Sequence, residues 1–176
     1  ILDKKVGKEP PVFVKIIAWL LVGALYVCQT SGIHFRFTNK TPDDAVLLIG
    51  IIIMAAGAVI EAVSDSQKSA QKAKRPDMPA TEGIFKMVRC PNYFGEILFW
   101  TGVFVAGITS YNGPLQWILS ALGFVIIFYI MWDGAKRMEK GHIERYGSNP
   151  EYRAYADKTP VLIPIIPLYH IYKEKK

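Results

Sequence analysis

The sequence predicts an all-α fold, a multi-spanning membrane helix bundle, from three observations. Hydrophobic residues make up 51% of the 176 residues, and the mean hydropathy is positive at +0.21, which is unusual for a soluble domain. The apolar residues gather in four runs, each close to the roughly 20 residues that a helix needs to cross a bilayer. The charged residues lie mostly between and beyond these runs. We therefore expect one membrane domain over residues 1–176.

The four membrane-spanning helices are expected at Val12–Gln29, Ala45–Val63, Tyr93–Thr109 and Pro114–Trp132. The second contains the unbroken apolar run LLIGIIIMAAGAVI, and the NKTPDD stretch before it predicts a turn and an N-cap. Residues 109–114, TSYNGP, predict a tight hairpin. This hairpin would make the third and fourth helices antiparallel neighbours.

The distribution of Lys and Arg predicts the orientation of the bundle. Residues 64–92 carry six of them, and six more lie between Trp132 and Lys158. Positive charge marks the cytoplasmic side of membrane proteins, so we expect these basic loops and both termini to be cytoplasmic. Four crossings are consistent with that arrangement. The net charge of +6 is then explained by contact with anionic lipid or an anionic ligand, and we expect no nucleic-acid partner.

Two further features limit the interpretation. The stretch TPVLIPIIPLY near the C-terminus is apolar, but its prolines at 160, 164 and 167 exclude a regular spanning helix. We expect it to pack at the membrane boundary, while the polar loops cover a cofactor. The cysteines, Cys28 and Cys90, form no CxxC motif and no cluster with histidine, so we expect neither a disulfide framework nor a metal site.

The segment RCPNYFGE at residues 89–96 carries the first candidate site. Pro91 suits the first turn of a helix, and Asn92, Glu96 and Trp100 then share one face. Ionisable side chains inside a membrane helix are costly and mark functional sites by default. Gly95 permits close approach of another backbone or a flat ligand. The alternative is ordinary helix capping with a glutamate at the level of the lipid headgroups.

A second candidate site lies at the expected end of the second helix. Glu61 and Asp65 are four residues apart there, and Lys68 and Lys72 continue the same helix. Two carboxylates at a helix C-terminus oppose the helix macrodipole, so a ligand's hydroxyls or neighbouring cations should compensate them. The alternative is ordinary solvation at the membrane interface.

The third candidate site follows the fourth helix. It is the run Asp133, Arg137, His142, Arg145 and Tyr146, in which Asp133 and Arg137 are spaced for an ion pair and His142 and Tyr146 share one helix face. Further basic and aromatic residues come next, namely Tyr152, Arg153, Tyr155 and Lys158. Such a mixture can stack on an adenine ring and bind phosphates, although a snorkelling amphipathic helix would look similar. The sequence has no GxGxxG and no Walker A motif, so membrane helices and their links would have to hold any nucleotide.

At these three places the chain resembles the membrane steroid 5-alpha-reductase family. VRCPNYFGEILFW is similar to the family's RHPNYFGE-type signature, and IEAVSDSQK is similar to the stretch upstream of it. HIERYGSNPEYRAYADKTPVLIP resembles the family's C-terminal pattern of tyrosines before a Leu-Ile-Pro ending. The three blocks occur in the family's order over about residues 45–167, which is most of the chain.

The resemblance implies NADPH-dependent reduction of a carbon–carbon double bond conjugated to a ketone, in a steroid-like or other lipid substrate within the membrane. Carried over by position, Asn92 and Glu96 would contact the nicotinamide or ribose, and Asp65 with Lys68 or Lys72 the adenosine end. The full set of implied cofactor-binding residues is Asp65, Lys68, Lys72, Asn92, Tyr93, Glu96, Arg137, His142, Tyr146, Arg153, Tyr155 and Lys158.

The chain departs from the family pattern in two ways. Cys90 stands where the family usually has a histidine beside the proline. The family's proton-donating tyrosine and its partner glutamate lie in helices upstream of the position equivalent to Ile1, so the chain is expected to be N-terminally incomplete. We therefore assign no general acid.

Two alternative functions remain open at this point. Membrane methyltransferases of the isoprenylcysteine carboxyl or phospholipid type share a similar helix start and C-terminal layout. Their cofactor, S-adenosylmethionine, is a sulfonium cation without phosphates, whereas NADPH carries a diphosphate and a 2′-phosphate. Twelve Lys and Arg over the two basic segments favour the polyphosphate. The third possibility is a sterol-binding relative without catalytic activity.

Overall fold

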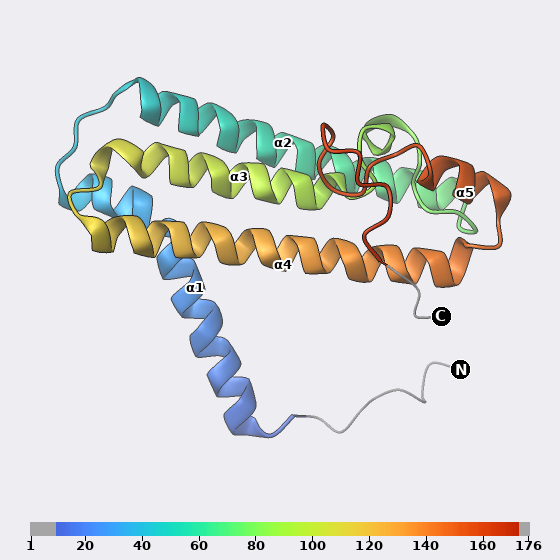
Figure 1. Cartoon of the computed structure of the whole chain (residues 1–176), viewed down its shortest axis with the longest axis horizontal. Coiled ribbons are helices and arrows are strands. Elements are labelled where there is room, and N and C mark those ends of the chain that lie inside the picture. Colours follow the sequence, from blue (N-terminus) through green and yellow to red (C-terminus); the bar gives the residue numbers. More distant parts are fainter. Residues whose placement is uncertain (1–9, 173–176) are drawn as a thin grey trace.

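The computed structural model describes residues 10–172, and all regular secondary structure over that range is helical (Figure 1). Four long helices, α1 (Val12–Thr38), α2 (Ala45–Lys74), α3 (Pro91–Gly107) and α4 (Pro114–Tyr146), are followed by the short α5 (Pro150–Ala156). Two 3-10 turns, η1 (Gly83–Lys86) and η2 (Ile108–Ser110), lie in the links. All four long helices are long and apolar enough to cross a membrane, which confirms the predicted fold class.

Three of the four helices extend well beyond the predicted spans. α1 continues from Gln29 to Thr38, α2 from Val63 to Lys74, and α4 from Trp132 to Tyr146. Hydropathy marks only the apolar part of a helix. The Lys, Gln and Ala residues that extend α2 are good helix formers, whereas the extension of α1, TSGIHFRFT, is held by contacts of Ser31 and Arg36 with the bundle. One sequence argument is corrected as a result. Glu61 and Asp65 lie inside α2 and not at its C-terminus, so the macrodipole places no demand on them.

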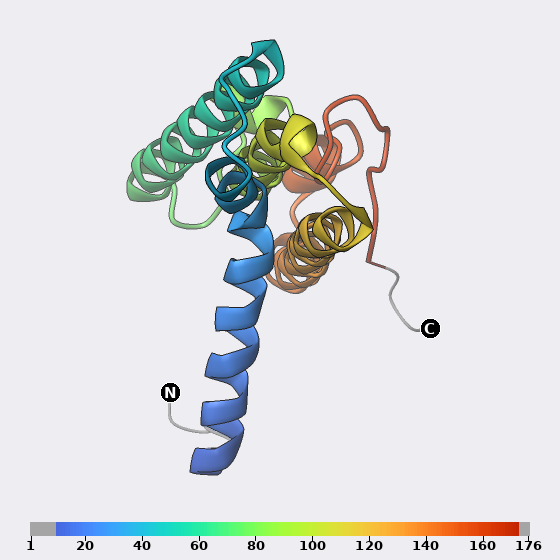
Figure 2. The same ribbon diagram turned by 90° about the vertical axis from the view of Figure 1, so that its left-hand side faces the viewer.

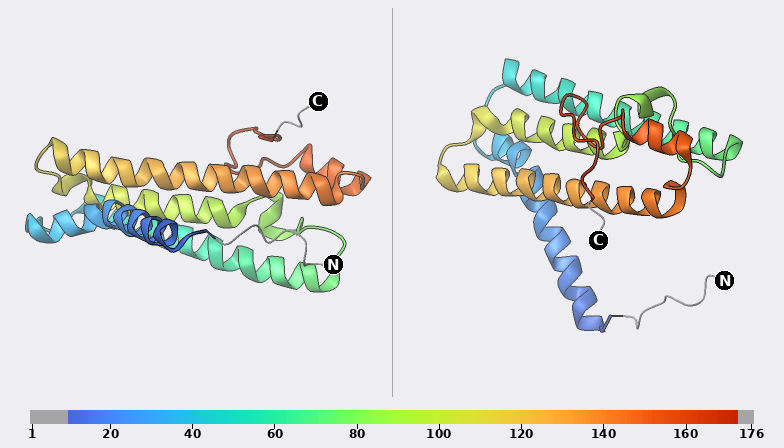
Figure 3. Two further views of the ribbon diagram at one scale, coloured as in Figure 1. Left: turned by 90° about the horizontal axis from the view of Figure 1, so that it is seen from below. Right: turned by 45° about the vertical axis from the view of Figure 1, so that its right-hand side comes forward.

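In the bundle, α3 lies between α2 and α4 (Figures 1 and 3). α2 and α3 contact each other backbone to backbone, because glycines face each other at Gly50 and Gly102 and again at Gly57 and Gly95. A Cβ atom added to Gly57 would lie 2.6 Å from the carbonyl oxygen of Gly95, and one added to Gly102 would lie 2.5 Å from that of Gly50. Small residues permit this kind of close helix packing in membranes. The predicted hairpin between α3 and α4 is also present.

α1 joins the bundle through its second half only. Its first half projects away from the other helices (Figures 1 and 2), and Trp19 is exposed there. In the second half, the hydroxyls of Ser31 and Ser120 lie 2.6 Å apart, which links α1 to α4. A Cβ atom on Gly123 would lie 2.6 Å from the backbone of Cys28, so α1 and α4 are also in close contact.

The end of the bundle where α1 ends and α2 begins is called the hairpin end here, since the α3–α4 hairpin also lies there. The buried Arg36 donates to the Asp44 carboxylate at 2.7 Å and to the carbonyl oxygen of Ala106 at 2.9 Å. Asp44 also accepts from the backbone of Leu47 at 2.7 Å, which confirms the predicted N-cap of α2. Hydrogen bonds, chiefly from Thr109, hold the pKa of Asp44 well below its ordinary value.

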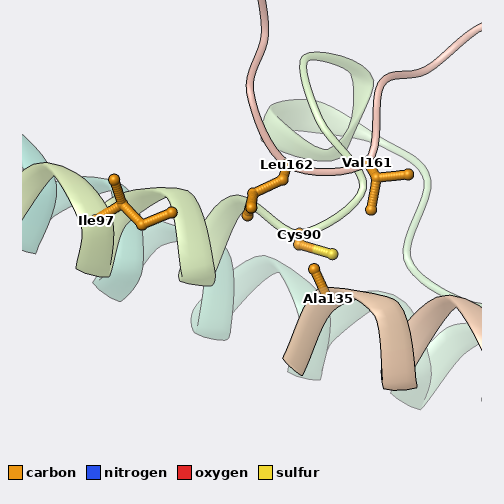
Figure 4. Close-up of a cluster of buried hydrophobic side chains, with 5 residues drawn as sticks. All are labelled: Cys90, Ile97, Ala135, Val161 and Leu162. Carbon is orange, nitrogen blue, oxygen red and sulfur yellow. The ribbon is translucent and has the colours of Figure 1, made fainter. Parts of the chain in front are cut away.

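The opposite end, with the last turns of α2 and α4, residues 75–90, α5 and the C-terminal stretch, is called the basic end. Residues 160–161 lie beside the start of α3, where the Arg89 and Cys90 backbones donate to the carbonyls of Pro160 (2.8 Å) and Val161 (2.9 Å). Cys90, Ile97, Ala135, Val161 and Leu162 form a buried apolar cluster there (Figure 4). As predicted, the Pro-rich stretch is not helical; it packs against α3 and α4.

Candidate anion-binding site

A cavity of about 180 Å³ opens at the basic end, between α2, residues 79–85, the start of α3 and the end of α4. Its lining is rich in cations and aromatic rings and consists of Lys68, Lys72, Pro79, Ala80, Phe85, Arg89, Asn92, Met138, His142, Arg145 and Tyr146. None of the described residues that line this cavity is acidic. Such a lining attracts an anion. Helix spacing brings its residues together, since Lys68 and Lys72 share one face of α2 and His142 and Tyr146 share one face of α4.

Lys72 is held in the cavity by three hydrogen bonds. Its ammonium donates to the carbonyl oxygens of Pro76 (2.9 Å) and Met78 (3.0 Å) and to the hydroxyl of Tyr146 (3.0 Å). It also lies 5.4 Å from the centroid of the Tyr146 ring, within the range of a cation–π contact. These partners are neutral, so the positive charge of Lys72 is not compensated by them.

Aromatic rings support the α4 side of the cavity. The ring of His142 lies 5.6 Å from that of Tyr146 and 6.2 Å from that of Tyr152, both edge-to-face. Tyr146 and Tyr152 are also neighbours, at 5.9 Å. Burial raises the pKa of Tyr152, which keeps its phenol neutral. The rings of Tyr146 and Tyr152 therefore pack against the imidazole of His142 and fix its orientation.

The roof of the cavity, residues 75–90, is attached to α2 by two glutamines. The side-chain oxygen of Gln71 accepts from the backbone of Thr81, and that of Gln67 from the backbone of Ile84, each at 2.9 Å. Gly83 has a φ of +66°, and a Cβ atom there would lie 2.8 Å from the carboxamide carbon of Gln67. Glycine is required at this turn for both reasons, and the roof is consequently well ordered.

Behind the cavity lies a fully buried ion pair, Arg89 with Glu139, at 2.8 Å. Arg89 also donates to the carbonyl oxygens of Thr159 (3.2 Å) and Tyr169. Glu139 accepts from the backbones of Ile171 (2.8 Å) and Tyr172 (2.7 Å). A buried charge pair is tolerated only when hydrogen bonds satisfy its remaining atoms, which is the case here. The pair fixes Arg89 as part of the cavity wall.

A second cavity, of about 410 Å³, lies on the other side of Arg89. It is bounded by α4, α5 and the C-terminal stretch, and its lining is Arg89, Ile143, Gly147, Tyr152, Arg153, Ala156, Asp157, His170 and Tyr172. Unlike the first cavity, it contains a carboxylate, since Asp157 lies 3.1 Å from the His170 ring. Its charge is therefore partly balanced within the protein.

Of the residues singled out by sequence, five line the first cavity together: Lys68, Lys72, Asn92, His142 and Tyr146. They come from three helices, and the RCPNYFGE segment contributes only Asn92 and Arg89 to the lining. Arg153 lines the second cavity, where it contacts the carbonyl oxygen of Gly147. The three candidate segments thus converge at the basic end, although not with all their residues.

Three expected residues of α2 and α3 lie outside both cavities. The Glu96 carboxylate accepts from the indole of Trp100 at 2.8 Å, so the two residues do share a helix face, but Glu96 does not reach the lining. Tyr93 packs in the apolar cluster, 3.2 Å from the position of a Cβ on Gly134. Asp65 is exposed on the surface of α2.

The remaining expected residues, Arg137, Tyr155 and Lys158, also lie outside the cavities. Arg137 is 71% exposed and pairs with Asp133, as its spacing predicts. The buried hydroxyl of Tyr155 donates to the carbonyl of Phe85 at 2.7 Å, and burial raises its pKa. Tyr155 thus attaches α5 to the roof, whereas Lys158 is simply exposed.

Sequence reasoning missed Glu139 altogether, and it named Arg89 and Arg145 only as members of the first and third candidate segments. Glu139 lies in the charged run RMEK, which is typical of an exposed helix face, so its complete burial has no local signal. Arg89 does stand directly before the Cys-Pro that starts α3, and that position could have singled it out. Arg145 precedes Tyr146 and has the helical spacing of three residues from His142.

Cys90 takes no part in the lining of either cavity. Its side chain is fully buried in the apolar cluster, and its sulfur lies 3.8 Å from that of Met138. Burial raises the pKa of the thiol to about 12, so it is protonated and unreactive at neutral pH. Over residues 10–172, no group of three or more His, Cys, Asp or Glu side chains is arranged to hold a metal ion.

Comparison with known proteins gives a family but no solved relative. The family described as "Protein of unknown function (DUF1295)" matches residues 11–159. A protein of Ustilaginoidea virens named probable O-methyltransferase ustE is 29% identical over 140 residues, which cover 68% of this chain and 45% of that protein. The uncharacterized protein C594.04c of Schizosaccharomyces pombe is 34% identical over 84 residues, covering 47% and 22%. The chain thus spans less than half of each relative. No solved structure matches it.

Proposed function

This chain belongs to the DUF1295 family, and from that premise we propose that its basic end binds NADPH for the reduction of a carbon–carbon double bond in a lipid ketone. The proposal concerns the whole protein, of which this chain supplies the cofactor-binding part. It agrees with the resemblance of three segments to the steroid 5-alpha-reductase family. All three of those segments contribute directly to the cavity at the basic end, through Lys68, Asn92 and His142 respectively.

The observation that carries the proposal is the uncompensated positive charge of the first cavity. Lys68, Lys72, Arg89 and Arg145 line it, and among the described lining residues only Arg89 has a carboxylate partner. Charge-assisted hydrogen bonds from Lys and Arg are the strong contacts that proteins make to phosphates. A nucleotide with a diphosphate and a 2′-phosphate supplies the negative charge that this lining lacks.

The size of the cavity limits how much of the nucleotide it encloses. Ligand pockets commonly have roughly 300–1,000 Å³, whereas this cavity has about 180 Å³. It therefore fits a phosphate-bearing part of NADPH rather than the entire dinucleotide. The remainder would extend along the exposed surface of α2, or residues 79–85 of the roof would have to open.

Individual side chains suit separate parts of the cofactor. Lys68 and Arg145 would hold phosphates, whereas the three donors of Lys72 are already used within the protein, so that it would add only its positive charge. The amide of Asn92 can both donate to and accept from a ribose hydroxyl or a carboxamide. Arg89, fixed by Glu139, would present its charge without moving. When bound, NADPH supplies the hydride for the β-carbon of the ketone. The proton for the other end of the double bond has no assigned donor among the described residues.

Methyl transfer from S-adenosylmethionine is the second candidate, and one observation favours it: the relative named as a probable O-methyltransferase. The charge of the cavity argues against it. The sulfonium of S-adenosylmethionine is a cation, and four cationic side chains would repel it, although they could hold its single carboxylate. Nothing in the cavity lining offers the sulfonium a carboxylate.

The direct test is calorimetric titration of the detergent-solubilised full-length protein with NADPH, NADH and S-adenosylmethionine side by side. We expect near-stoichiometric NADPH binding, which Lys68→Gln weakens about tenfold through the loss of one charged contact, worth about 1.4 kcal/mol. Arg137→Gln is the matched control, since it removes the same charge outside the cavity and should leave affinity unchanged.

Two results would overturn the proposal. One is tight binding of S-adenosylmethionine with no binding of NADPH. The other is equal loss of NADPH affinity in Lys68→Gln and Arg137→Gln, because only net charge would then matter and not the cavity.

A further inference from the structure

The stretch after α5 contains a closed loop, residues 162–168, which is called the tail loop here. The backbone of Val161 donates to the carbonyl of Leu168 at 2.9 Å and closes the loop at its base. Inside it, Ile166 donates to Ile163 at 3.2 Å and Leu168 to Ile166 at 2.7 Å. These bonds make the tail loop a compact unit and not an extended strand.

The base of the tail loop lies beside the beginning of a membrane-spanning helix. Leu162 is buried in the cluster with Cys90 and Ile97, and Figure 4 shows it between these two residues of the α3 region. Ile97 lies six residues beyond Pro91, which is about 9 Å along a helix. The base of the loop is therefore at the depth of the first turns of α3, where headgroups give way to acyl chains.

The tip of the tail loop is apolar and open. Ile165 is 91% exposed, Ile166 is 43% exposed, and Leu168 and Tyr169 are also exposed. No charged residue occurs between Thr159 and Tyr169. Such an uninterrupted apolar projection is unfavourable in water and is typical of a contact with lipid or with another apolar surface.

The backbone of the tail loop is suited to leaving water. Pro164 and Pro167 have no N–H group, and the N–H groups of Ile166 and Leu168 donate within the loop. Every unsatisfied backbone donor is costly in a lipid environment, and four of the seven residues of this loop present none.

A cation lies beside the segment that follows the tail loop. The Lys140 ammonium is 5.8 Å from the ring of Tyr172, four residues beyond the loop. Apolar side chains at the tip with a cation beyond the base match the layers of a lipid leaflet, in which acyl chains lie below anionic headgroups.

We infer that the tail loop inserts Ile165 and Ile166 into the lipid interface of the leaflet at the basic end. The partner is the membrane surface itself. The inference does not depend on which cofactor the protein binds. It does give the tail a role at the site, because Tyr169, Ile171 and Tyr172 lead from the loop to the hydrogen bonds on Arg89 and Glu139.

The test uses an environment-sensitive fluorophore on single cysteines in protein reconstituted into phosphatidylcholine–phosphatidylglycerol nanodiscs. Cys28→Ser removes one native thiol, and Cys90 is buried and unreactive. The probe is attached at Ile165→Cys, where full exposure leaves folding unaffected. Ser148→Cys, exposed between α4 and α5, is the matched control at the same end.

We expect the probe at position 165 to emit at a shorter wavelength than the probe at position 148. It should lose most of its fluorescence to a nitroxide lipid labelled near the glycerol backbone and little to aqueous iodide, with the reverse at position 148. Equal quenching by iodide at both positions would overturn the inference. Shielding from iodide without quenching by the nitroxide lipid would also overturn it, since a protein contact would then cover the loop.

Discussion

The two ends of the bundle each contain a buried arginine paired with a carboxylate, but the pairs lie in different surroundings. At the hairpin end, Arg36 and Asp44 bond each other and nearby backbone groups, with only the Nε atom of Arg36 left without a partner among the described residues. The hollow beside Asp44 is lined by Asp43, Asp44, Ala45, Leu47, Leu48 and Ile51, none of which is a cation. At the basic end, Arg89 and Glu139 are likewise paired, yet Lys68, Lys72 and Arg145 stand beside them without a carboxylate in the lining. The ion pair at the hairpin end therefore serves to connect the helices, while the basic end has positive charge available for a ligand.

The largest difference in stability between the two ends is expected when one member of the buried pair at the basic end is removed. Glu139→Gln leaves Arg89 buried without its counter-charge, which should cost about 3–5 kcal/mol of unfolding free energy. Titration with sodium dodecyl sulfate in mixed micelles measures this. Asp44→Asn is the matched variant at the hairpin end, where Asp44 is 31% exposed and water can replace it, so its cost should be smaller. Equal costs at the two ends would contradict the account.

The glycine contacts between α2 and α3 lie along the helices that run between the two ends. Adding a methyl group at one of these glycines tests the close packing. Gly57→Ala places a Cβ against backbone atoms of Gly95 and Phe99 and should cost about 1–3 kcal/mol through overpacking. Gly141→Ala is the control, because a Cβ there meets nothing within 4 Å and alanine is the better helix former. A neutral Gly57→Ala would mean that the helices are farther apart than described.

How far the sequence predicts each region follows from the range of the forces involved. Hydropathy and charge are local properties of the sequence. They therefore predict the four spans and the position of the basic segments together at one end of the bundle. Helix spacing is also local, and it places Lys68 with Lys72 and His142 with Tyr146 on shared faces. The burial of Glu139 depends on residues 171–172 folding back onto α4, a contact between distant parts of the chain that no local pattern encodes.

The same reasoning explains which site residues were expected but lie elsewhere. Asp65 and Arg137 have the right chemistry and lie one helix turn or less from lining residues, yet they point to the surface. Sequence spacing fixes which residues share a face, but it does not fix which face turns toward the cavity. That choice is made by the packing of α3 between α2 and α4.

The smallest effect is expected at the exposed ion pair of Arg75 with Glu151, whose two contacts are 2.7 and 2.9 Å. Solvent screens this pair, so Arg75→Gln should barely change the unfolding midpoint at neutral pH. The pKa of Glu151 is lowered by its hydrogen bond with Arg75, so the pair contributes above the ordinary glutamate pKa and its contribution is lost as pH falls. A large effect of Arg75→Gln at pH 7 would show that α5 depends on this surface contact.

The most direct measurement of the central claim is hydrogen–deuterium exchange of the full-length protein in nanodiscs, with and without saturating NADPH. The account predicts slower exchange in residues 68–89 and 138–146, which surround the cationic cavity, and no change in residues 36–47 at the hairpin end. Unchanged exchange at the basic end, or protection appearing at the hairpin end instead, would contradict it.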